Sequence, residues 1–181
     1  MDILLPLAML WGLGYGFNTG IVKQIRDDIG LLLGTVLAVW FSATVLTVML
    51  SRHIAFPDPQ FGIGVVFAVM LIIGFAVATA IASSFIGGLT FGRDLERRSA
   101  IGRALGGVLG VVNAVILMTL LMLTIHLILS GNIQQTWSVA RSINRGAEIS
   151  VTGQLLQRVA AALYTLIHGL LPPGVPPAFH I

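Results

Sequence analysis

The chain contains no cysteine and few charged residues. Asp, Glu, Lys and Arg together make up 9% of its 181 residues, whereas globular proteins average roughly a quarter. The lack of cysteine excludes disulfides, thiolate catalysis and cysteine-ligated metal sites. Because 56% of the residues are hydrophobic, the composition predicts an integral membrane protein.

Charged residues divide the chain into apolar stretches of about the 20 residues that a bilayer core requires. These stretches run from Ile3 to Val22, Ile29 to Leu50, Phe61 to Ile86 and Ala104 to Ser130. We expect an all-α membrane domain over residues 1–130 with four transmembrane helices and with the charges at their joints. The first stretch lacks the basic start and cleavage site of a signal peptide, so we expect a retained helix. Ser83-Ser84 and Gly87-Gly88 leave open whether the third helix bends near its end.

The joints predict the orientation of the helices, because basic residues near the spans favour the cytoplasm. The first joint contains Lys23, Arg26, Asp27 and Asp28, and the basic residues of the third are Arg93, Arg97, Arg98 and Arg103. These joints carry six basic residues against four elsewhere, which predicts extracytoplasmic termini in an inner membrane. The four arginines of the third joint suit anionic lipid headgroups. No aromatic platforms accompany these arginines, so the sequence does not support nucleic-acid binding.

Glycines recur every four residues in two of the stretches. The first glycine series is Gly12, Gly16 and Gly20, and the last glycine series is Gly102, Gly106 and Gly110. Gly30, Gly34 and Ala38 repeat the spacing in the second stretch. Such a series lies on one helical face and lets another backbone approach closely. The spacing is compatible with packing inside one four-helix unit and with a contact between copies, which would make a homo-oligomer.

Polar side chains within the stretches are few. Asn113 follows the last glycine series and predicts a hydrogen bond between helices, with Ser83 or Ser84 as its partner at the same depth, or else a ligand or pore contact. His126 can change charge near neutral pH, but its place near the end of the fourth stretch favours an interfacial hydrogen bond. No third group accompanies Ser83, Ser84 and His126 as a catalytic set requires. We expect neither an enzyme nor a cofactor or metal site.

The tryptophan positions and the C-terminal region lead to two further structural predictions. Trp11 and Trp40 are equally far from a first turn centred on Gln24 to Asp27, which predicts either an internal pair or two lipid-exposed rings. Residues 131–181 form the second region, with a polar linker from Asn132 to Ser150. Polar and apolar residues then alternate with helical period from Val151 to Leu171, which predicts an amphipathic helix on the membrane or on the bundle.

The sequence also resembles a known family. The run from Gly12 to Gly20 with Lys23-Gln24, then Gly34 and Ala38, is similar to the start of the colicin V production protein family of bacterial inner-membrane proteins. The run from Arg103 to Gly110 resembles the glycine signature of that family's last span. The chain departs from this signature at Gly102, where the family has Asp, at Asn113, where it often has Arg, and at Ala114, where it has Gly.

The resemblance implies a four-span membrane protein that supports toxin production or export and envelope homeostasis. Some relatives fuse this module to an extracytoplasmic protease domain. The resemblance therefore also implies that this chain acts with a separate extracytoplasmic or secretion partner. Together with the glycine spacing, this predicts a non-enzymatic protein in the lipid bilayer that associates with itself. The alternative is a small oligomeric channel, similar to some mechanosensitive channels, lined by the Gly/Ala face from Ala104 to Ala114.

Overall fold

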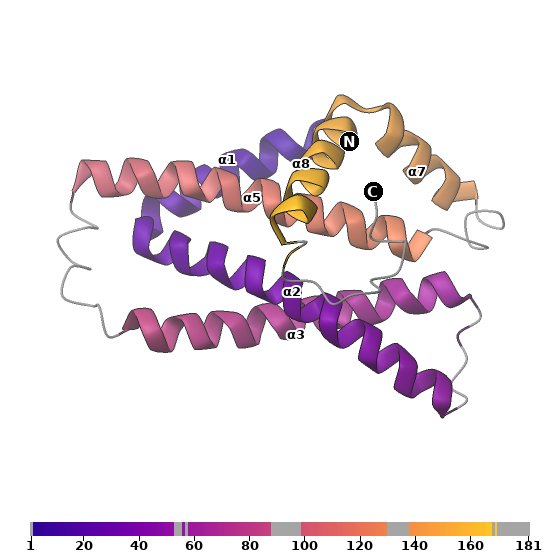
Figure 1. Ribbon diagram of the computed structural model, residues 1–181. Coiled ribbons are helices and arrows are strands. Elements are labelled where there is room, and N and C mark those ends of the chain that lie inside the picture. Colours follow the sequence, from indigo (N-terminus) through magenta and orange to yellow (C-terminus); the bar gives the residue numbers. More distant parts are fainter. Residues whose placement is uncertain are drawn as a thin grey trace.

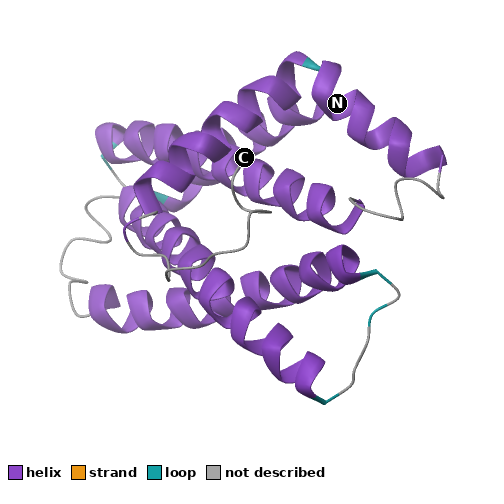
Figure 2. Ribbon diagram, turned by 45° about the vertical axis from the view of Figure 1, so that its right-hand side comes forward, coloured by secondary structure: helices purple, strands orange, loops and turns teal. Residues whose placement is uncertain are grey.

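The computed structural model describes residues 2–52, 56, 58–87, 99–129, 138–167 and 169, and this part of the chain is helical without strands. Its helices are α1 (Leu4–Thr19), α2 (Ile21–Ser51), α3 (Pro59–Gly87), α5 (Ala100–Leu129), α7 (Ser138–Ile149) and α8 (Val151–Ile167). Figure 1 shows the long helices α2, α3 and α5, with α1 and α8 beside α5 and with α7 next to α8, and Figure 2 shows the same helices from another side. The predicted all-α class is confirmed.

Three helices are long and apolar enough to cross a membrane. Their candidate spans are Ile21–Met49 in α2, Phe61–Ser84 in α3 and Ala100–Leu129 in α5. Helix α3 continues past Ser83 and Ser84 to Gly87, and both hydroxyls donate to carbonyl groups one turn earlier in the same helix. Helix α1 has 16 residues, a length of about 24 Å at about 1.5 Å per residue. It is shorter than the predicted span from Ile3 to Val22.

Helix α5 lies between α1 on one side and the pair α2–α3 on the other (Figure 1). It runs antiparallel to α1, since Gly12 lies against Gly110 and Gly16 against Gly106. It is also antiparallel to α3, because Gly64 lies against Ile128. Where α2, α3 and α5 meet, apolar side chains form a buried core whose members are Ala38, Val39, Phe67 and Leu127.

The first turn of the chain is not where the charges predicted it. Helix α1 ends at Thr19, and Gly20 has φ 81°, a left-handed conformation that glycine adopts without the strain of a side chain. Helix α2 then starts at Ile21, so the predicted joint around Lys23 to Asp28 belongs to its first two turns. The prediction of a charged loop at this point was wrong, because a single glycine suffices to reverse the chain.

The two tryptophans do not form an internal pair. Trp11 is 64% exposed and Trp40 is 49% exposed on the surface of the bundle. Helix α1 packs on α5 and α2 packs on α3, so the hairpin that would bring the rings together does not form. The structure therefore agrees with the alternative of two exposed tryptophan rings. Trp11 stacks on Tyr15 of its own helix, with ring centroids 5.3 Å apart.

The tail is more helical than predicted. Helix α7 occupies part of the expected linker, and α8 begins at Val151, where the amphipathic helix was predicted. Leu156 is buried and Gln154 is exposed, as predicted, but Leu155 and Leu166 of the predicted apolar face are exposed. Asp2 accepts a hydrogen bond of 3.0 Å from the backbone N–H of Thr152 at the start of α8. Hydrogen bonds from Thr152 hold the pKa of the Asp2 carboxyl below its usual range.

Candidate functional site

The first and last glycine series face each other where α1 crosses α5. A Cβ atom built on Gly16 would collide with the carbonyl oxygen of Gly106, and one built on Gly12 would collide with that of Gly110. In the other direction, a Cβ on Gly106 would lie 2.6 Å from the carbonyl oxygen of Gly16. All four glycines are buried. The two backbones are therefore in direct contact, and a side chain at any of these positions must push the helices apart.

A second glycine contact joins α2 to α3. A Cβ on Gly34 would lie 2.8 Å from the Cα of Phe75, and one on Gly74 would lie 2.7 Å from the carbonyl oxygen of Gly34. One turn earlier, a Cβ on Gly30 would lie 2.6 Å from Oγ1 of Thr79. This contact therefore sets glycine against a side chain as well as against backbone.

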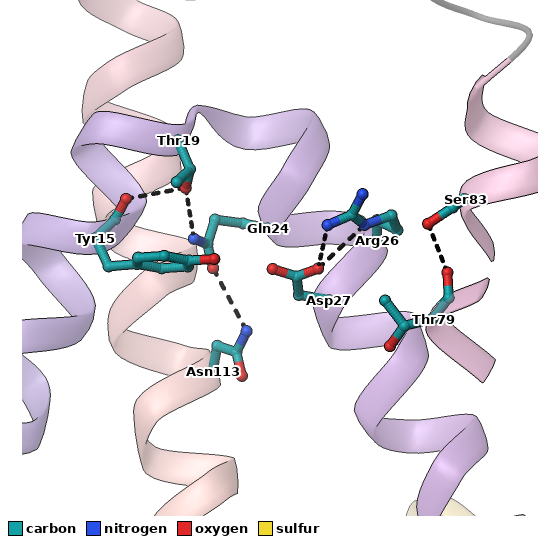
Figure 3. Close-up of polar contacts among 8 residues, drawn as sticks. All are labelled: Tyr15, Thr19, Gln24, Arg26, Asp27, Thr79, Ser83 and Asn113. Carbon is teal, nitrogen blue, oxygen red and sulfur yellow. Dashed lines mark hydrogen bonds and ion pairs between the residues drawn. The ribbon is translucent and has the colours of Figure 1, made fainter. Parts of the chain in front are cut away.

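Polar side chains connect three helices beside the α1–α2 turn (Figure 3). Gln24 has no exposed surface, and its Nε2 donates to Oγ1 of Thr19 at 2.9 Å. Thr19 donates in turn to the carbonyl oxygen of Tyr15 at 2.9 Å. The amide of Asn113 on α5 donates to Oε1 of Gln24 at 3.5 Å. This chain of hydrogen bonds ties the start of α2 to both α1 and α5.

The charges of α2 lie around this chain of hydrogen bonds. Arg26 donates to Oδ1 of Asp27 through Nε at 3.1 Å and through a terminal nitrogen at 2.9 Å, which forms an ion pair within the helix. Lys23 places Nζ 4.7 Å from the ring centroid of Tyr15, a cation–π contact. Asp28 differs from Asp27, because its buried Oδ1 has no hydrogen-bond partner. We refer to Thr19, Lys23, Gln24, Arg26, Asp27, Asp28 and Asn113 as the polar cluster.

The polar cluster lies level with the middle of α5. Asn113 is about 20 Å along a helix of about 45 Å, at about 1.5 Å per residue. The candidate span of α2 also includes the charged residues from Lys23 to Asp28. The sequence prediction assigned these residues to a joint, because it treated every group of charges as the end of a span. Gly20 was the signal for the true turn, since it ends the first glycine series immediately before α2 begins.

Asn113 is the one predicted site residue within the polar cluster. It was expected to bond Ser83 or Ser84, but its partner in the structure is Gln24. The remaining predicted polar and basic residues lie apart from the cluster. Arg103 is exposed on the first turn of α5, with its guanidinium 5.3 Å from the ring centroid of Phe17. His126 is exposed in the last turn of α5. Arg93, Arg97 and Arg98 lie outside the described residues.

The described residues contain no group of three or more His, Asp or Glu side chains that could hold a metal ion. They contain two glycine contacts, and the polar cluster lies beside the turn between α1 and α2. The geometry therefore combines tight helix packing with a polar cluster inside the bundle.

Comparison with known proteins assigns this architecture to a family. The model of the family described as Colicin V production protein matches residues 1–151, which include α1, α2, α3, α5 and α7. The chain belongs to this family. The resemblance predicted from the glycine spacing is thereby confirmed. No curated protein matches the chain, and no solved structure matches it.

Proposed function

We propose that this chain, a membrane protein of a family whose name, Colicin V production protein, associates it with toxin production, acts in the bacterial inner membrane as a non-enzymatic accessory. In this role it supports the production or export of a colicin V-like toxin and envelope homeostasis. The family match over residues 1–151 carries this proposal. The match extends over all three membrane-length helices and the polar cluster.

The positions of the potential reactive groups support a non-enzymatic role. Ser83 donates its hydrogen bond to the carbonyl of Thr79, within its own helix. Because Gly64 of α3 meets Ile128 of the antiparallel α5, Ser83 is about 28 Å along α3 from the end that carries His126. These two groups are too far apart to act as nucleophile and base, which must lie within hydrogen-bond reach.

A four-span topology with both termini outside the cytoplasm is consistent with the packing of the chain ends. Asp2 bonds Thr152, so the N-terminus and the tail helix meet at one place. Both belong on one side of the membrane if α1 crosses it together with α2, α3 and α5. On the opposite side, Arg103 and the other arginines of the third joint would contact lipid headgroups.

We also propose that the protein associates with itself through the outer face of α1 and with a secretion or envelope partner. Gly12 and Gly16 are covered by α5, so they are not free to meet a second copy. Gly14 is exposed, and a Cβ built on it would meet nothing within 4 Å. Asn18 is exposed one turn later. Its amide both donates and accepts, so two copies related by a two-fold axis can pair with each other.

The channel alternative has less support. It needs the face of Gly106, Gly110 and Ala114 to line a pore, yet these residues are buried. Gly106 and Gly110 meet the backbone of α1, and Ala114 lies near Gly12. A pore lined by this face would require α1 to leave α5.

The test of the accessory role uses a bacterial host that carries the colicin V determinants and lacks its own family member. We expect the intact chain to restore toxin in the culture medium, without conductance when the purified protein is placed in a planar bilayer. Gly16→Leu should restore less, because it separates α1 from α5, whereas Gly14→Leu reports on the outer face of α1. Conductance by the intact chain would favour the channel, and no restoration of toxin would contradict the accessory role.

A separate experiment tests self-association and uses the absence of cysteine. Gly14→Cys should give a disulfide-linked dimer after oxidation of native membranes, because the thiol lies on an open face. Leu121→Cys, exposed on α5, is the matched control on another lipid-facing surface. Equal dimer yields from the two variants, or none from Gly14→Cys, would contradict an interface on α1.

A further inference from the structure

The two carboxylates at the start of α2 differ in their surroundings. Asp27 has its charge neutralised by Arg26, which donates to Oδ1 through two nitrogen atoms. Asp28 makes no ion pair within the described part of the chain, and its buried Oδ1 accepts no hydrogen bond there. The neighbouring cations have other contacts, since Lys23 lies over the ring of Tyr15.

The position of Asp28 makes an ionised carboxylate costly. Asp28 lies one helical turn after Gln24, which is level with the middle of α5 through its contact with Asn113. It also lies about 10 Å inside the candidate span that starts at Ile21. A charged group at membrane depth without a partner is unfavourable. Binding a proton converts the carboxylate into a neutral acid whose O–H can donate a hydrogen bond.

Among the residues that the structure describes, the helices packed around Asp28 offer no compensating charge. Helix α3 contains no titratable side chain from Pro59 to Gly87. The titratable groups of α5 are Arg103 in its first turn and His126 in its last turn, both far from its middle. Helix α1 contributes Tyr15, whose ring contacts Lys23. The remaining charges on α2 are Lys23, Arg26 and Asp27, and the last two pair with each other.

A second buried polar atom lies on the helix that packs beside this part of α2. Oγ1 of Thr79 is buried without a hydrogen-bond partner, and it faces Gly30, two residues after Asp28. Buried polar atoms without partners are rare and commonly indicate a functional group or a bound species. Two of them therefore lie where α2 enters the bundle.

We infer that Asp28 is a proton-binding carboxyl within the membrane, which takes up and releases a proton as the pH crosses its titration range. The proton binds to a carboxylate oxygen and leaves to water, without any other bond changing. Asp27, one residue away, is paired with Arg26. The sequence alone gave no reason to separate these two neighbours, since both were assigned to a joint outside the spans.

The experiment uses a hydrophobic carbodiimide, which reacts with neutral carboxylic acids from the lipid phase. The full-length protein in native membranes is treated over a series of pH values, and the adduct is located by mass spectrometry. We expect the adduct at Asp28, with its yield falling by about tenfold for each pH unit above the titration range. Asp27 and the exposed Asp2 should carry little label at neutral pH. The adduct is located in the unmodified chain, so the result does not depend on a variant that folds.

Asp28→Asn and Asp27→Asn form the matched pair of variants. Labelling should disappear in Asp28→Asn and persist in Asp27→Asn. The infrared band of a neutral carboxylic acid, recorded on protein in lipid, should follow the same pattern and decrease as the pH rises. A chain with no adduct at Asp28 and no such band would overturn the inference. So would equal labelling of Asp28, Asp27 and Asp2, because that would show no difference in proton binding.

Discussion

The two glycine contacts differ in what lies opposite each glycine. Between α1 and α5, Gly12 and Gly16 meet the carbonyl groups of Gly110 and Gly106, so both sides are rigid backbone. Between α2 and α3, Gly34 also meets backbone, that of Gly74 and Phe75, but Gly30 meets the hydroxyl of Thr79, a side chain that can change rotamer.

The same glycine spacing can therefore produce contacts that differ in how well they tolerate an added side chain. Helices in a membrane gain little from the hydrophobic effect when they associate, so close van der Waals packing must hold them together. A contact made entirely of backbone has no part that can adjust to an added atom. A position where the glycine faces a side chain, such as Gly30, can yield, and we therefore expect it to accept small substitutions better.

The largest effect should come from Gly16→Leu. The added side chain would meet the carbonyl of Gly106 and must separate α1 from α5. We expect a loss of about 3 kcal/mol in the free energy of unfolding, at the upper end for overpacked sites. Thermal unfolding of the purified protein in micelles, followed by circular dichroism, measures the change. Gly14→Leu on the open face is the control, and equal losses for the two variants would contradict the packing.

Hydrogen bonds of Gln24 tie the start of α2 to α1 and α5, so Gln24→Ala should weaken the packing of α2 on these two helices. The substitution leaves the partly buried amide of Asn113 without its partner and removes one of the two hydrogen bonds of Thr19. We expect a loss of about 2 kcal/mol, within the cost of about 1–3 kcal/mol for buried polar groups left without a hydrogen bond. The same unfolding measurement applies, with the exposed Gln157→Ala on α8 as control. A loss no larger than that of the control would show that the hydrogen bonds contribute nothing to stability.

A smaller effect is expected from Gly30→Ala, because the new methyl group would lie 2.6 Å from Oγ1 of Thr79. We expect a loss of about 1 kcal/mol, the low end for overpacking. Thr79→Ala removes the obstructing hydroxyl, so the double variant should be more stable than the sum of the two single changes predicts. A double-mutant cycle measures this coupling. Strict additivity would mean that Thr79 does not limit the contact.

The smallest effect concerns the contact of the N-terminus with α8. The pKa of Asp2 is lowered by its hydrogen bonds with Thr152, so the carboxylate supports the docking of α8 at pH values above its usual titration range, about 3.9. This support should disappear as the pH falls through the lowered pKa of the folded state. Hydrogen exchange of the Thr152 amide measures it, and Asp2→Asn should remove most of the dependence. Unchanged exchange on acidification would contradict the contact.

The sequence predicted which segments form the long helices better than it predicted the turn between α1 and α2 and the contacts between helices. Apolar stretches identified α2, α3 and α5 because length and hydropathy are local properties. The charged residues did not indicate the position of the first turn, because Lys23 to Asp28 lie within helix α2. The partner of Asn113 depended on the helix order around α5, which no local pattern contains. Exposure of Trp11 and Trp40 followed from the same arrangement.

The most direct test of the account asks whether α1 packs on α5 of the same chain. A Cβ built on Gly107 would lie 3.9 Å from the Cβ of Phe17, within the range of about 3.5–4.5 Å in disulfides. In this cysteine-free chain, the double variant Phe17→Cys/Gly107→Cys should oxidise to an internal disulfide. We expect a monomer band on a non-reducing gel, with both thiols protected from alkylation. Free thiols, or a dimer band with no internal disulfide, would contradict the packing of α1 against α5.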